Sequence, residues 1–390
     1  MKFIDMFSGI GGFRTAMENN GHECIAYSEI DKYAKRSYQA MYDTENEIDL
    51  GDITNISQEY LSHFKQENDI VVGGSPCQSF SLAGSRKGFE DTRGTLFFEY
   101  AKVVKETQPK YFLFENVKGL MSHDKGNTIR VVLETFNELG YCIDFNVFNS
   151  KYYGVPQNRE RIYILGKRKD LVEQPKYHDK TKGKKKFDEI HNWAVDNINY
   201  IELLPPLQTE VTTRLIDVLE DEVDEKYYLS DEKTKKLTLN TDLSGKLNMY
   251  NYNERDKVHS VNKVSPTLNT MQGGDRQPKI AVREATKQGY AIAEQGDSVN
   301  VTYPDSKTRR GRVGKQVAQT LQAGEVNQGV VMEDIRIRKL TPLECWRLQG
   351  FSDEQFYKAK DSGVSNSQLY KQAGNSVTVN VVDAIVKELD

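Results

Sequence analysis

A single cysteine stands in a loop of small and polar residues, Gly73-Gly74-Ser75-Pro76-Cys77-Gln78-Ser79-Phe80-Ser81, directly after an apolar run. A free cysteine kept for packing normally lies inside an apolar element, because its thiol behaves as a small hydrophobe. Glycine, serine and proline around Cys77 instead favour a backbone that comes close to another molecule. This pattern indicates a presented thiol, which is a candidate nucleophile.

A second candidate is the carboxylate of Glu115, which ends the apolar run Tyr111-Phe112-Leu113-Phe114. An apolar neighbourhood raises the pKa of a carboxyl group and favours its protonated, hydrogen-donating form. Asn116 offers another interpretation, in which this segment only caps a following turn. Further along, Gln157-Asn158-Arg159-Glu160-Arg161 places two arginines at alternate positions. Side chains alternate across a strand, so we expect one of the two to reach the site.

The segment Phe7-Ser8-Gly9-Ile10-Gly11-Gly12-Phe13 has the pattern of a ligand-binding turn between a strand and a helix. Its glycines let a ligand approach the backbone, and the helix start offers free N–H groups. A dinucleotide fingerprint needs another small residue where this chain has Arg14, which disfavours a nicotinamide enzyme. Glu29 is placed to bind ribose hydroxyls, and Asp52 to accept a hydrogen bond from an adenine amino group beside Ile53. The pattern predicts an adenosine-containing ligand; the alternative is a tight turn flanked by surface acids.

Short apolar runs alternate with helix-like segments over residues 1–168. We predict strands at Phe3–Phe7, Cys24–Ser28, Asp69–Val72, Tyr111–Glu115, Cys142–Phe148 and Arg161–Leu165. We predict helices at Phe13–Asn20, Lys32–Met41, Thr95–Glu106 and Thr128–Leu139. Such alternation predicts an α/β fold with a doubly wound, mostly parallel sheet and helices on both faces. Ligands of such sheets bind outside the carboxyl ends of the strands, where Cys77 and Glu115 fall.

Residues 169–336 are polar and irregular, whereas apolar and aromatic residues return from about Arg336 to the end. We therefore predict a discontinuous α/β domain, residues 1–168 plus 337–390, which carries a smaller, irregular domain at residues 169–336. The polar part contains two similar segments that both end in Thr-Leu, Ser265-Pro266-Thr267-Leu268 and Ala318-Gln319-Thr320-Leu321. Residues 375–386 predict a turn that leads into an apolar helix.

The composition is that of an ordinary soluble protein, with 28% charged residues, 37% hydrophobic residues and a net charge of −4. No apolar run approaches the roughly 20 residues that span a bilayer, and the first residues do not have the pattern of a signal peptide. Four widely spaced cysteines without CxxC pairing predict no metal site and a reducing cytoplasm. Basic residues cluster at 180–186 and 307–315, a pattern that alone indicates a solvated surface.

Taken together, these motifs resemble the DNA cytosine-5 methyltransferases of bacterial restriction–modification systems. The polar stretch falls where that family keeps its target-recognition domain, which a Thr-Leu pair often identifies. Each motif is weak alone, but their common order along the chain is specific. The matching segments are Phe7–Phe13, Glu29, Gly51-Asp52, Pro76-Cys77-Gln78, Arg93-Gly94-Thr95-Leu96-Phe97-Phe98, Glu115-Asn116-Val117, Gln157-x-Arg159-x-Arg161, Arg338-Lys339-Leu340-Thr341-Pro342 and Gly374-Asn375-Ser376-Val377.

The resemblance implies an enzyme that transfers a methyl group from S-adenosylmethionine to double-stranded DNA. Cys77 would attack ring carbon-6 of a cytosine flipped out of the duplex. Glu115 would hydrogen-bond or protonate ring nitrogen N3, and Arg159 or Arg161 would steady the base carbonyl or a phosphate. Carbon-5 would then take the methyl group, and elimination would release Cys77.

The resemblance also assigns binding residues. The cofactor-binding residues it implies are Phe7, Gly9, Ile10, Gly11, Gly12, Glu29, Ile30, Asp52, Ile53, Pro76, Leu96, Asn375 and Ser376. The DNA-binding residues are Gln78, Ser79, Ser81, Arg86, Lys87 and Arg93, in a loop expected to close over the flipped base, together with Thr267-Leu268 and Thr320-Leu321. We expect a monomer encoded by a bacterium or a phage, paired with a restriction endonuclease that acts independently.

Other classes explain the sequence less completely. An RNA-directed relative, acting on transfer RNA, would carry a much shorter recognition segment. A non-catalytic nucleic-acid-binding relative would have lost the nucleophile, yet Cys77 is present. A thiol hydrolase needs a histidine base, and neither His63 nor His123 lies in a suitable motif. A dehydrogenase would leave the Pro-Cys-Gln loop unexplained.

Overall fold

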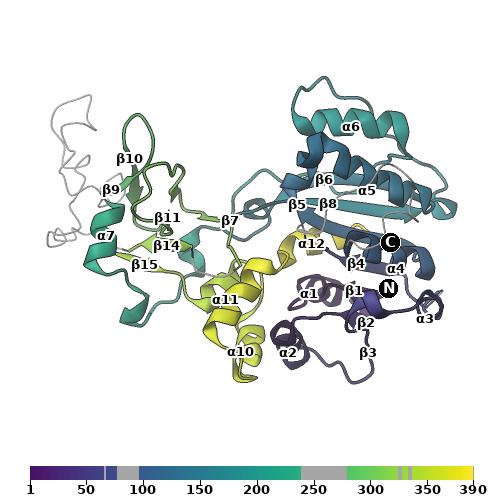
Figure 1. Ribbon diagram of the computed structural model, residues 1–390, viewed down its shortest axis with the longest axis horizontal. Helices are drawn as coiled ribbons and strands as arrows, with labels where there is room; N and C mark the ends of the chain where they lie inside the picture. The colour runs from purple at the N-terminus through teal and green to yellow at the C-terminus, as the bar shows by residue number, and fades with distance from the viewer. Residues whose placement is uncertain (66, 77–95, 239–278, 324–326, 333–335, 390) are drawn as a thin grey trace.

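Seven strands form the central sheet of the larger domain (Figure 1). The computed structural model of the chain describes residues 1–65, 67–76, 96–238, 279–323, 327–332 and 336–389. Strands β1 to β5 are parallel, whereas β8 runs antiparallel to its neighbours β5 and β6, so the predicted α/β fold with a mostly parallel sheet is confirmed. In the sheet order β3-β2-β1-β4-β5-β8-β6, the strands are β1 (Lys2–Met6), β2 (Glu23–Ser28), β3 (Ile48–Asp49), β4 (Ile70–Gly73), β5 (Tyr111–Val117), β6 (Tyr141–Asn149) and β8 (Glu160–Arg168).

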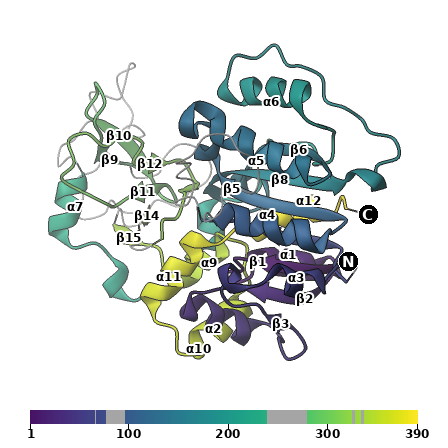
Figure 2. The same ribbon diagram turned by 45° about the vertical axis from the view of Figure 1, so that its right-hand side comes forward.

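Helices cover both faces of this sheet because successive side chains of each strand point to opposite faces. Phe3 and Ile70 belong to the core with α1, α2 and α12, and Ile4 and Val71 belong to the core with α4 and α5. The C-terminal helix α12 lies beside α1 (Figure 2), so the two ends of the chain complete one domain. The helices are α1 (Gly12–Asn19), α2 (Lys32–Met41), α3 (Gln58–Ser62), α4 (Leu96–Thr107), α5 (Asn127–Glu138), α6 (Lys186–Asn197) and α12 (Val379–Val386).

The strand order reverses between β1 and β4, since the chain lays β2 and β3 on one side of β1 and then returns to its other side. In open α/β sheets, ligands bind at such a switch point, outside the carboxyl ends of the strands. The turns after β1, β2, β4 and β5 all meet at this edge. The antiparallel strand β8 begins there, so its first residues join them.

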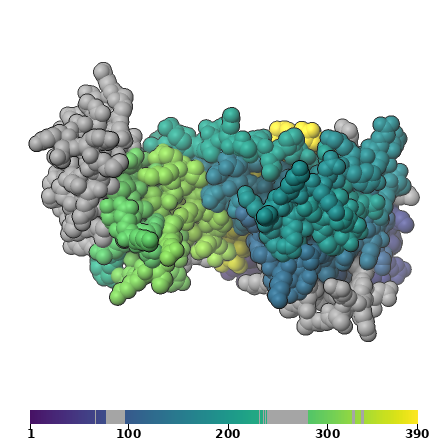
Figure 3. Space-filling model, turned by 90° about the horizontal axis from the view of Figure 1, so that it is seen from above, coloured from purple at the N-terminus to yellow at the C-terminus, as the bar shows by residue number. Residues whose placement is uncertain are grey.

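A smaller β-rich lobe lies at one end of the molecule (Figures 1 and 3). It contains the hairpin β9 (Lys279–Arg283) and β10 (Tyr290–Glu294), and an antiparallel sheet of order β12-β11-β14-β15. The sheet strands are β11 (Ser298–Asn300), β12 (Val313–Gly314), β14 (Gln328–Val331) and β15 (Ile337–Lys339), with α7 (Asp231–Leu237) alongside. Helices α9 (Pro342–Arg347), α10 (Asp353–Asp361) and α11 (Asn366–Asn375) connect this lobe to α12.

Residues that follow the predicted domain boundary at 168 still pack against the larger domain. Helix α6 follows residue 168, yet its side chains Ile190 and Ala194 belong to the same core as β5 and β6. Tyr200 forms a parallel bridge with Ile143 at the free edge of β6. We therefore propose that the first junction lies near residue 205, instead of at the predicted boundary between 168 and 169.

Candidate active site

The glycine loop, residues 7–12, leaves β1 in an unusual backbone conformation. Phe7 and Gly9 have φ angles of 54° and 57°, and Gly11 has a φ angle of 80°. The amide of Ser8 donates to the carbonyl of Ser28 at 2.9 Å, which ties the loop to the end of β2. A left-handed residue other than glycine is costly, so the surrounding contacts must hold Phe7 in place.

The glycines of this loop serve different purposes. A Cβ atom at Gly11 would lie 2.6 Å from the ring of Tyr42, and one at Gly12 would lie 2.6 Å from Cγ1 of Val377. These two glycines are therefore required by protein packing. Gly9 differs, since among the residues that the structure describes a Cβ atom there would meet only the Phe7 carbonyl oxygen, at 4.0 Å. Open space at Gly9 is where a ligand can approach the loop backbone.

Glu29 binds the glycine loop directly. One carboxylate oxygen accepts the amide of Gly9 at 2.8 Å, and the other accepts the amides of Ile30 at 2.8 Å and Asp31 at 2.7 Å. Glu29 thus holds together the turns that follow β1 and β2. Ile30, the next residue, is 72% exposed and offers an apolar surface at this edge.

The two residues predicted to face an adenine ring lie in different environments. The exposed carboxylate of Asp52 accepts the hydroxyl of Thr54 at 2.7 Å and its amide at 3.0 Å, and these bonds hold the pKa of Asp52 below its usual range. Ile53 is only 2% exposed and belongs to the core that also contains Leu50. Of the three isoleucines assigned to the cofactor, Ile10 and Ile53 are buried, and Ile30 has an exposed apolar side chain.

The end of β4 lies against the end of β5. A Cβ atom at Gly74 would lie 2.8 Å from Oε2 of Glu115. The side-chain amide of Asn116 donates to the carbonyl of Ser75 at 2.9 Å, so Asn116 holds the β4 turn and does more than cap its own segment. The chain that leads into Cys77 is thereby fixed beside Glu115. Cys77 itself, and Gln78, Ser79, Ser81, Arg86, Lys87 and Arg93, lie outside the described residues.

Glu115 and Arg161 form an ion pair at this edge, with Nε of Arg161 3.2 Å from Oε1 of Glu115. Both side chains are 15% exposed. Burial raises the pKa of Glu115, while the nearby charges of Arg161 and Arg159 partly lower it. A raised pKa favours the protonated form of a carboxyl group, which can donate a hydrogen bond or a proton to a base.

Arg159, which we predicted together with Arg161 as a catalytic residue, has a different environment. Its side chain is buried, and its two terminal nitrogens donate to the carbonyl oxygens of Gly374 at 3.2 Å and Ser376 at 2.6 Å. Burial lowers the pKa of this guanidinium to about 10. Among the described contacts, Arg159 thus fixes the segment before α12, and Arg161 is the arginine that pairs with Glu115.

The remaining predicted cofactor residues surround the same edge. Pro76 and Asn375 are exposed, Leu96 is partly exposed, and Ser376 is buried with its hydroxyl donating to the Val377 carbonyl at 3.1 Å. Ile10 is 1% exposed and its side chain belongs to the core, so only its backbone is available to a ligand.

Thr320 and Leu321 join the smaller lobe to the segment that precedes Arg159. The short strand β13 (Ala318–Gln319) pairs in parallel with β7 (Gln157–Asn158). The hydroxyl of Thr320 then donates to the carbonyl of Asn158 at 3.0 Å, and the amide of Leu321 to Oε1 of Gln157 at 3.2 Å. The second predicted pair, Thr267-Leu268, lies outside the described residues.

The other cysteines are poor candidates for the nucleophile. Cys24, Cys142 and Cys345 are buried and unpaired, and burial raises the pKa of each thiol. A thiol with a raised pKa carries little reactive thiolate at neutral pH.

Within the described part of the chain, no three His, Cys, Asp or Glu side chains are grouped to hold a metal ion. None of the described helices is both long and apolar enough to cross a membrane.

Two contacts at this edge were not predicted from the sequence. The Tyr42 hydroxyl lies 2.9 Å from the Gly11 carbonyl, and Asn116 bonds to Ser75. The placement of Tyr38 and Tyr42 one helical turn apart, on the segment that follows Glu29, was the available signal for Tyr42. Nothing in the sequence pairs Asn116 with Ser75.

The fold thus brings together a glycine turn after β1, the end of β4, and a partly buried carboxyl group paired with an arginine at the end of β5. The family model of C-5 cytosine-specific DNA methylases matches residues 1–390. The orphan methyltransferase M.SPRI of Bacillus phage SPR is 42% identical, over 100% of this chain and 97% of its own length. The type II methyltransferase M.HpaII of Haemophilus parainfluenzae is 35% identical, over 99% of this chain and 88% of its own. The chain therefore belongs to the C-5 cytosine-specific DNA methylase family and is a DNA cytosine methyltransferase.

Solved structures agree with this fold. A putative DNA modification methyltransferase encoded within an Escherichia coli prophage aligns with a TM-score of 0.58 and 21% identity, over 100% of this chain and 98% of its own. DNMT2 from Spodoptera frugiperda aligns with a TM-score of 0.56 and 19% identity, over 100% and 99%. At these identities the likeness concerns the fold alone.

Proposed function

We propose that this enzyme methylates carbon-5 of a cytosine flipped out of double-stranded DNA, with Cys77 as the nucleophile and Glu115 as the acid. The observation that carries the proposal is the position of Glu115. This buried carboxyl group has a raised pKa, pairs with Arg161, and lies against Gly74, close in sequence to Cys77. An acid and a nucleophile at one strand edge are what addition to a pyrimidine ring requires.

The chemistry follows from the poor reactivity of cytosine carbon-5. The Cys77 thiolate forms a bond to carbon-6, and Glu115 gives a proton to N3 as electron density moves into the ring. Carbon-5 then has enamine character, and S-adenosylmethionine, when bound, supplies the electrophilic methyl group. S-adenosylhomocysteine is left behind, and a water molecule takes the proton from carbon-5. The double bond between carbon-5 and carbon-6 then re-forms as the Cys77 thiolate leaves and N3 returns its proton to Glu115. Arg161 keeps the Glu115 carboxyl group oriented toward the base throughout.

The methyl donor fits the turns that follow β1, β2 and β3. Gly9 leaves open space along the loop backbone, and Ile30 presents a free apolar surface for an adenine ring. Asp52 is exposed and keeps its charge, which suits a contact with a polar edge of the ligand. The other residues that we propose to line this site are Phe7, Ile10, Gly11, Gly12, Glu29, Pro76, Leu96, Asn375 and Ser376, whereas Ile53 would contribute only its backbone.

We propose that Thr320-Leu321, and not Thr267-Leu268, is the pair that couples recognition to catalysis. Its support is the contact between Thr320 and Asn158, next to Arg159 on the chain. A base-reading lobe anchored there would sit in a fixed position relative to Glu115. Target recognition by residues between about 205 and 336 remains part of this proposal.

The biological setting is proposed from the relatives. Relatives named type II methyltransferases, such as M.HpaII, support a modification enzyme. We further propose that it works as a monomer and that a separate restriction endonuclease accompanies it. The phage relatives are named orphan methyltransferases, which favours a second possibility, methylation without a partner endonuclease. In either case the enzyme would act on DNA in the bacterial cytoplasm.

A direct test incubates the protein with S-adenosylmethionine and DNA, then identifies the methylated nucleoside by mass spectrometry. We expect 5-methyldeoxycytidine at one short sequence, which bisulfite mapping would read out. Methyl groups on an exocyclic amino group would contradict the proposed chemistry. Methylation of transfer RNA with no methylation of DNA would favour the RNA-directed alternative.

A further inference from the structure

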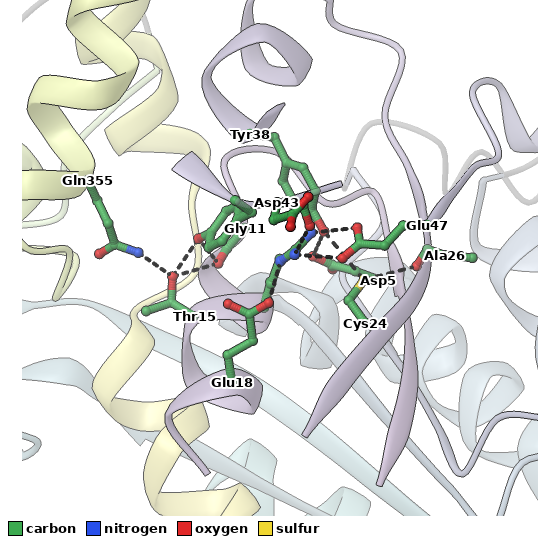
Figure 4. Close-up of polar contacts among 12 residues, drawn as sticks. Asp5, Gly11, Thr15, Glu18, Cys24, Ala26, Tyr38, Asp43, Glu47 and Gln355 are labelled. Atoms are coloured by element: carbon green, nitrogen blue, oxygen red, sulfur yellow. Dashed lines mark hydrogen bonds and ion pairs between the residues drawn. The ribbon is translucent and has the colours of Figure 1, made fainter. Parts of the chain in front are cut away.

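A chain of hydrogen bonds runs beneath the glycine loop and ends on its carbonyl groups. Nε2 of Gln355 donates to the hydroxyl of Thr15 at 3.0 Å, and that hydroxyl lies 2.6 Å from the hydroxyl of Tyr42. The Tyr42 hydroxyl in turn lies 2.9 Å from the carbonyl oxygen of Gly11 and 3.3 Å from that of Ile10. Figure 4 shows Gln355 and Thr15 leading toward Gly11. These hydrogen bonds join α10, α1 and the residue after α2 to the glycine loop.

The number of hydrogens that each group can donate limits the directions of these hydrogen bonds. Gln355 occupies an acceptor position of Thr15, so Thr15 donates its own hydrogen to Tyr42 or to the Gly11 carbonyl, 3.0 Å away. Tyr42 has one hydrogen, and both carbonyl groups within its reach belong to the loop. In either arrangement a hydroxyl hydrogen is directed at the loop backbone. Burial raises the pKa of Tyr42, so the hydroxyl stays a donor across the physiological range.

Buried charges fix the ring of Tyr42 in this position. The guanidinium carbon of Arg14 lies 4.4 Å from the centre of the Tyr42 ring. The guanidinium group binds both carboxylate oxygens of Glu47 at 2.6 and 2.7 Å and one oxygen of Glu18 at 2.8 Å. The Arg14 side chain is 3% exposed. A desolvated arginine over the face of an aromatic ring is attracted by the ring quadrupole, so the Tyr42 ring has little freedom to move.

We propose that Tyr42 is a positioning residue for the methyl donor, acting through its hydroxyl on the backbone of the glycine loop. The inference rests on the proposed function, because it takes the loop to be the donor-binding turn. Glu29 holds the loop at the Gly9 amide, and Tyr42 holds it at the Gly11 carbonyl. The open position at Gly9 lies at the first of these two contacts, two residues before the second. Tyr42 does not touch the donor or the base; it keeps the loop in the conformation that binds the donor.

The test compares Tyr42→Phe with Tyr38→Phe. Both residues lie on or next to α2, Tyr38 is buried and Tyr42 is half-buried, and each substitution removes one hydroxyl while keeping the ring. The Tyr38 hydroxyl bonds to Asp5 at 3.3 Å and not to the loop, which makes it the matched control. Loss of one neutral hydrogen bond costs about 0.5–1.5 kcal/mol, or roughly 2- to 12-fold in an equilibrium constant.

We expect Tyr42→Phe to raise both the KM for S-adenosylmethionine and the dissociation constant for S-adenosylhomocysteine by roughly 2- to 12-fold. The kcat and the DNA affinity should stay within about twofold, and Tyr38→Phe should match the wild type in donor binding. If both variants melt at a lower temperature but neither changes donor binding, Tyr42 is only structural and the inference is overturned. Equal losses of donor affinity in the two variants would overturn it as well. Failure of the wild type to bind S-adenosylhomocysteine would instead reject the proposed function.

Discussion

Arg159 and Arg161 are two residues apart, yet we predict that removing each one damages a different property of the enzyme. In Arg159→Met, the carbonyl oxygens of Gly374 and Ser376 lose their buried donors. Hydrogen bonds to a charged group contribute about 1.5–3 kcal/mol each, so two are worth about 3–6 kcal/mol. Part of this loss is offset because a charge is no longer buried. We expect the free energy of unfolding to fall by about 3 kcal/mol.

Arg161→Met is the matched control. Its partner Glu115 already has a pKa raised by burial, so it can take up a proton once the arginine is gone. The cost in stability should therefore stay below about 1 kcal/mol, as for a partly exposed ion pair. The rate of methyl transfer should fall instead, by roughly 10²-fold or more, because the acid loses its orientation.

Urea unfolding followed by tryptophan fluorescence separates the two outcomes, since Trp346 is fully buried in the core that receives the C-terminal segment. A loss of about 3 kcal/mol lowers the urea midpoint by about 1 M or more for an m-value of 1–3 kcal/mol/M. Equal midpoints for the two variants would refute the reasoning. So would a loss of activity in Arg159→Met without a loss of stability, because Arg159 would then act on the base.

Three further predictions concern other parts of the fold. Burial raises the pKa of Asp5 to about 8, so the folded state keeps a proton that the unfolded state releases above about pH 4. Stability should fall by up to about 1.4 kcal/mol per pH unit between about pH 4 and 8, and Asp5→Asn should flatten this slope in urea titrations; parallel slopes would reject the linkage. Desolvation lowers the pKa of His178, but its bond to Asp144 outweighs this and raises the pKa overall, so that stabilisation is present below about pH 6.5 and is lost as pH rises through the raised value. His178→Asn should therefore lose more stability at pH 6 than at pH 8, and an equal loss at both would show that the pair contributes no charge-dependent stability. Thr320→Val removes the bond to Asn158 and should raise the KM for DNA by roughly 2- to 12-fold while the KM for the donor is unchanged, and equal effects on both would contradict a role in DNA recognition.

Much of the larger domain was predictable because its signals are local. The predicted helix Lys32–Met41 matches α2, where Asp31 caps the first turn by accepting the amide of Tyr33 at 2.9 Å. The buried strands were found from short runs of β-branched and aromatic residues. Strand β3 was missed because two residues carry no periodic pattern. Helix α6 was missed because its buried positions, Ile190, His191 and Ala194, are few among charged residues.

The site was predictable only where one segment carries the chemistry. Glu115 was identified from the apolar strand before it, and the structure places it in a partly buried ion pair with Arg161. The contacts of Arg159 could not be foreseen, because its partner Gly374 lies 215 residues away along the chain. The same holds for Ile53, whose side chain faces the core and not the open edge. Such contacts depend on how the C-terminal segment and the helices return to the sheet.

The central claim is that Cys77 attacks cytosine beside the acid Glu115, and DNA that contains 5-fluorocytosine at the methylated position tests it most directly. Fluorine at carbon-5 cannot leave as a proton does, so the bond between the enzyme and carbon-6 cannot be released after methyl transfer. We predict a covalent protein–DNA complex that requires S-adenosylmethionine, is attached through Cys77 by peptide mass spectrometry, and is absent in Cys77→Ser. A complex through another cysteine, or none at a sequence that the enzyme methylates, would contradict the account.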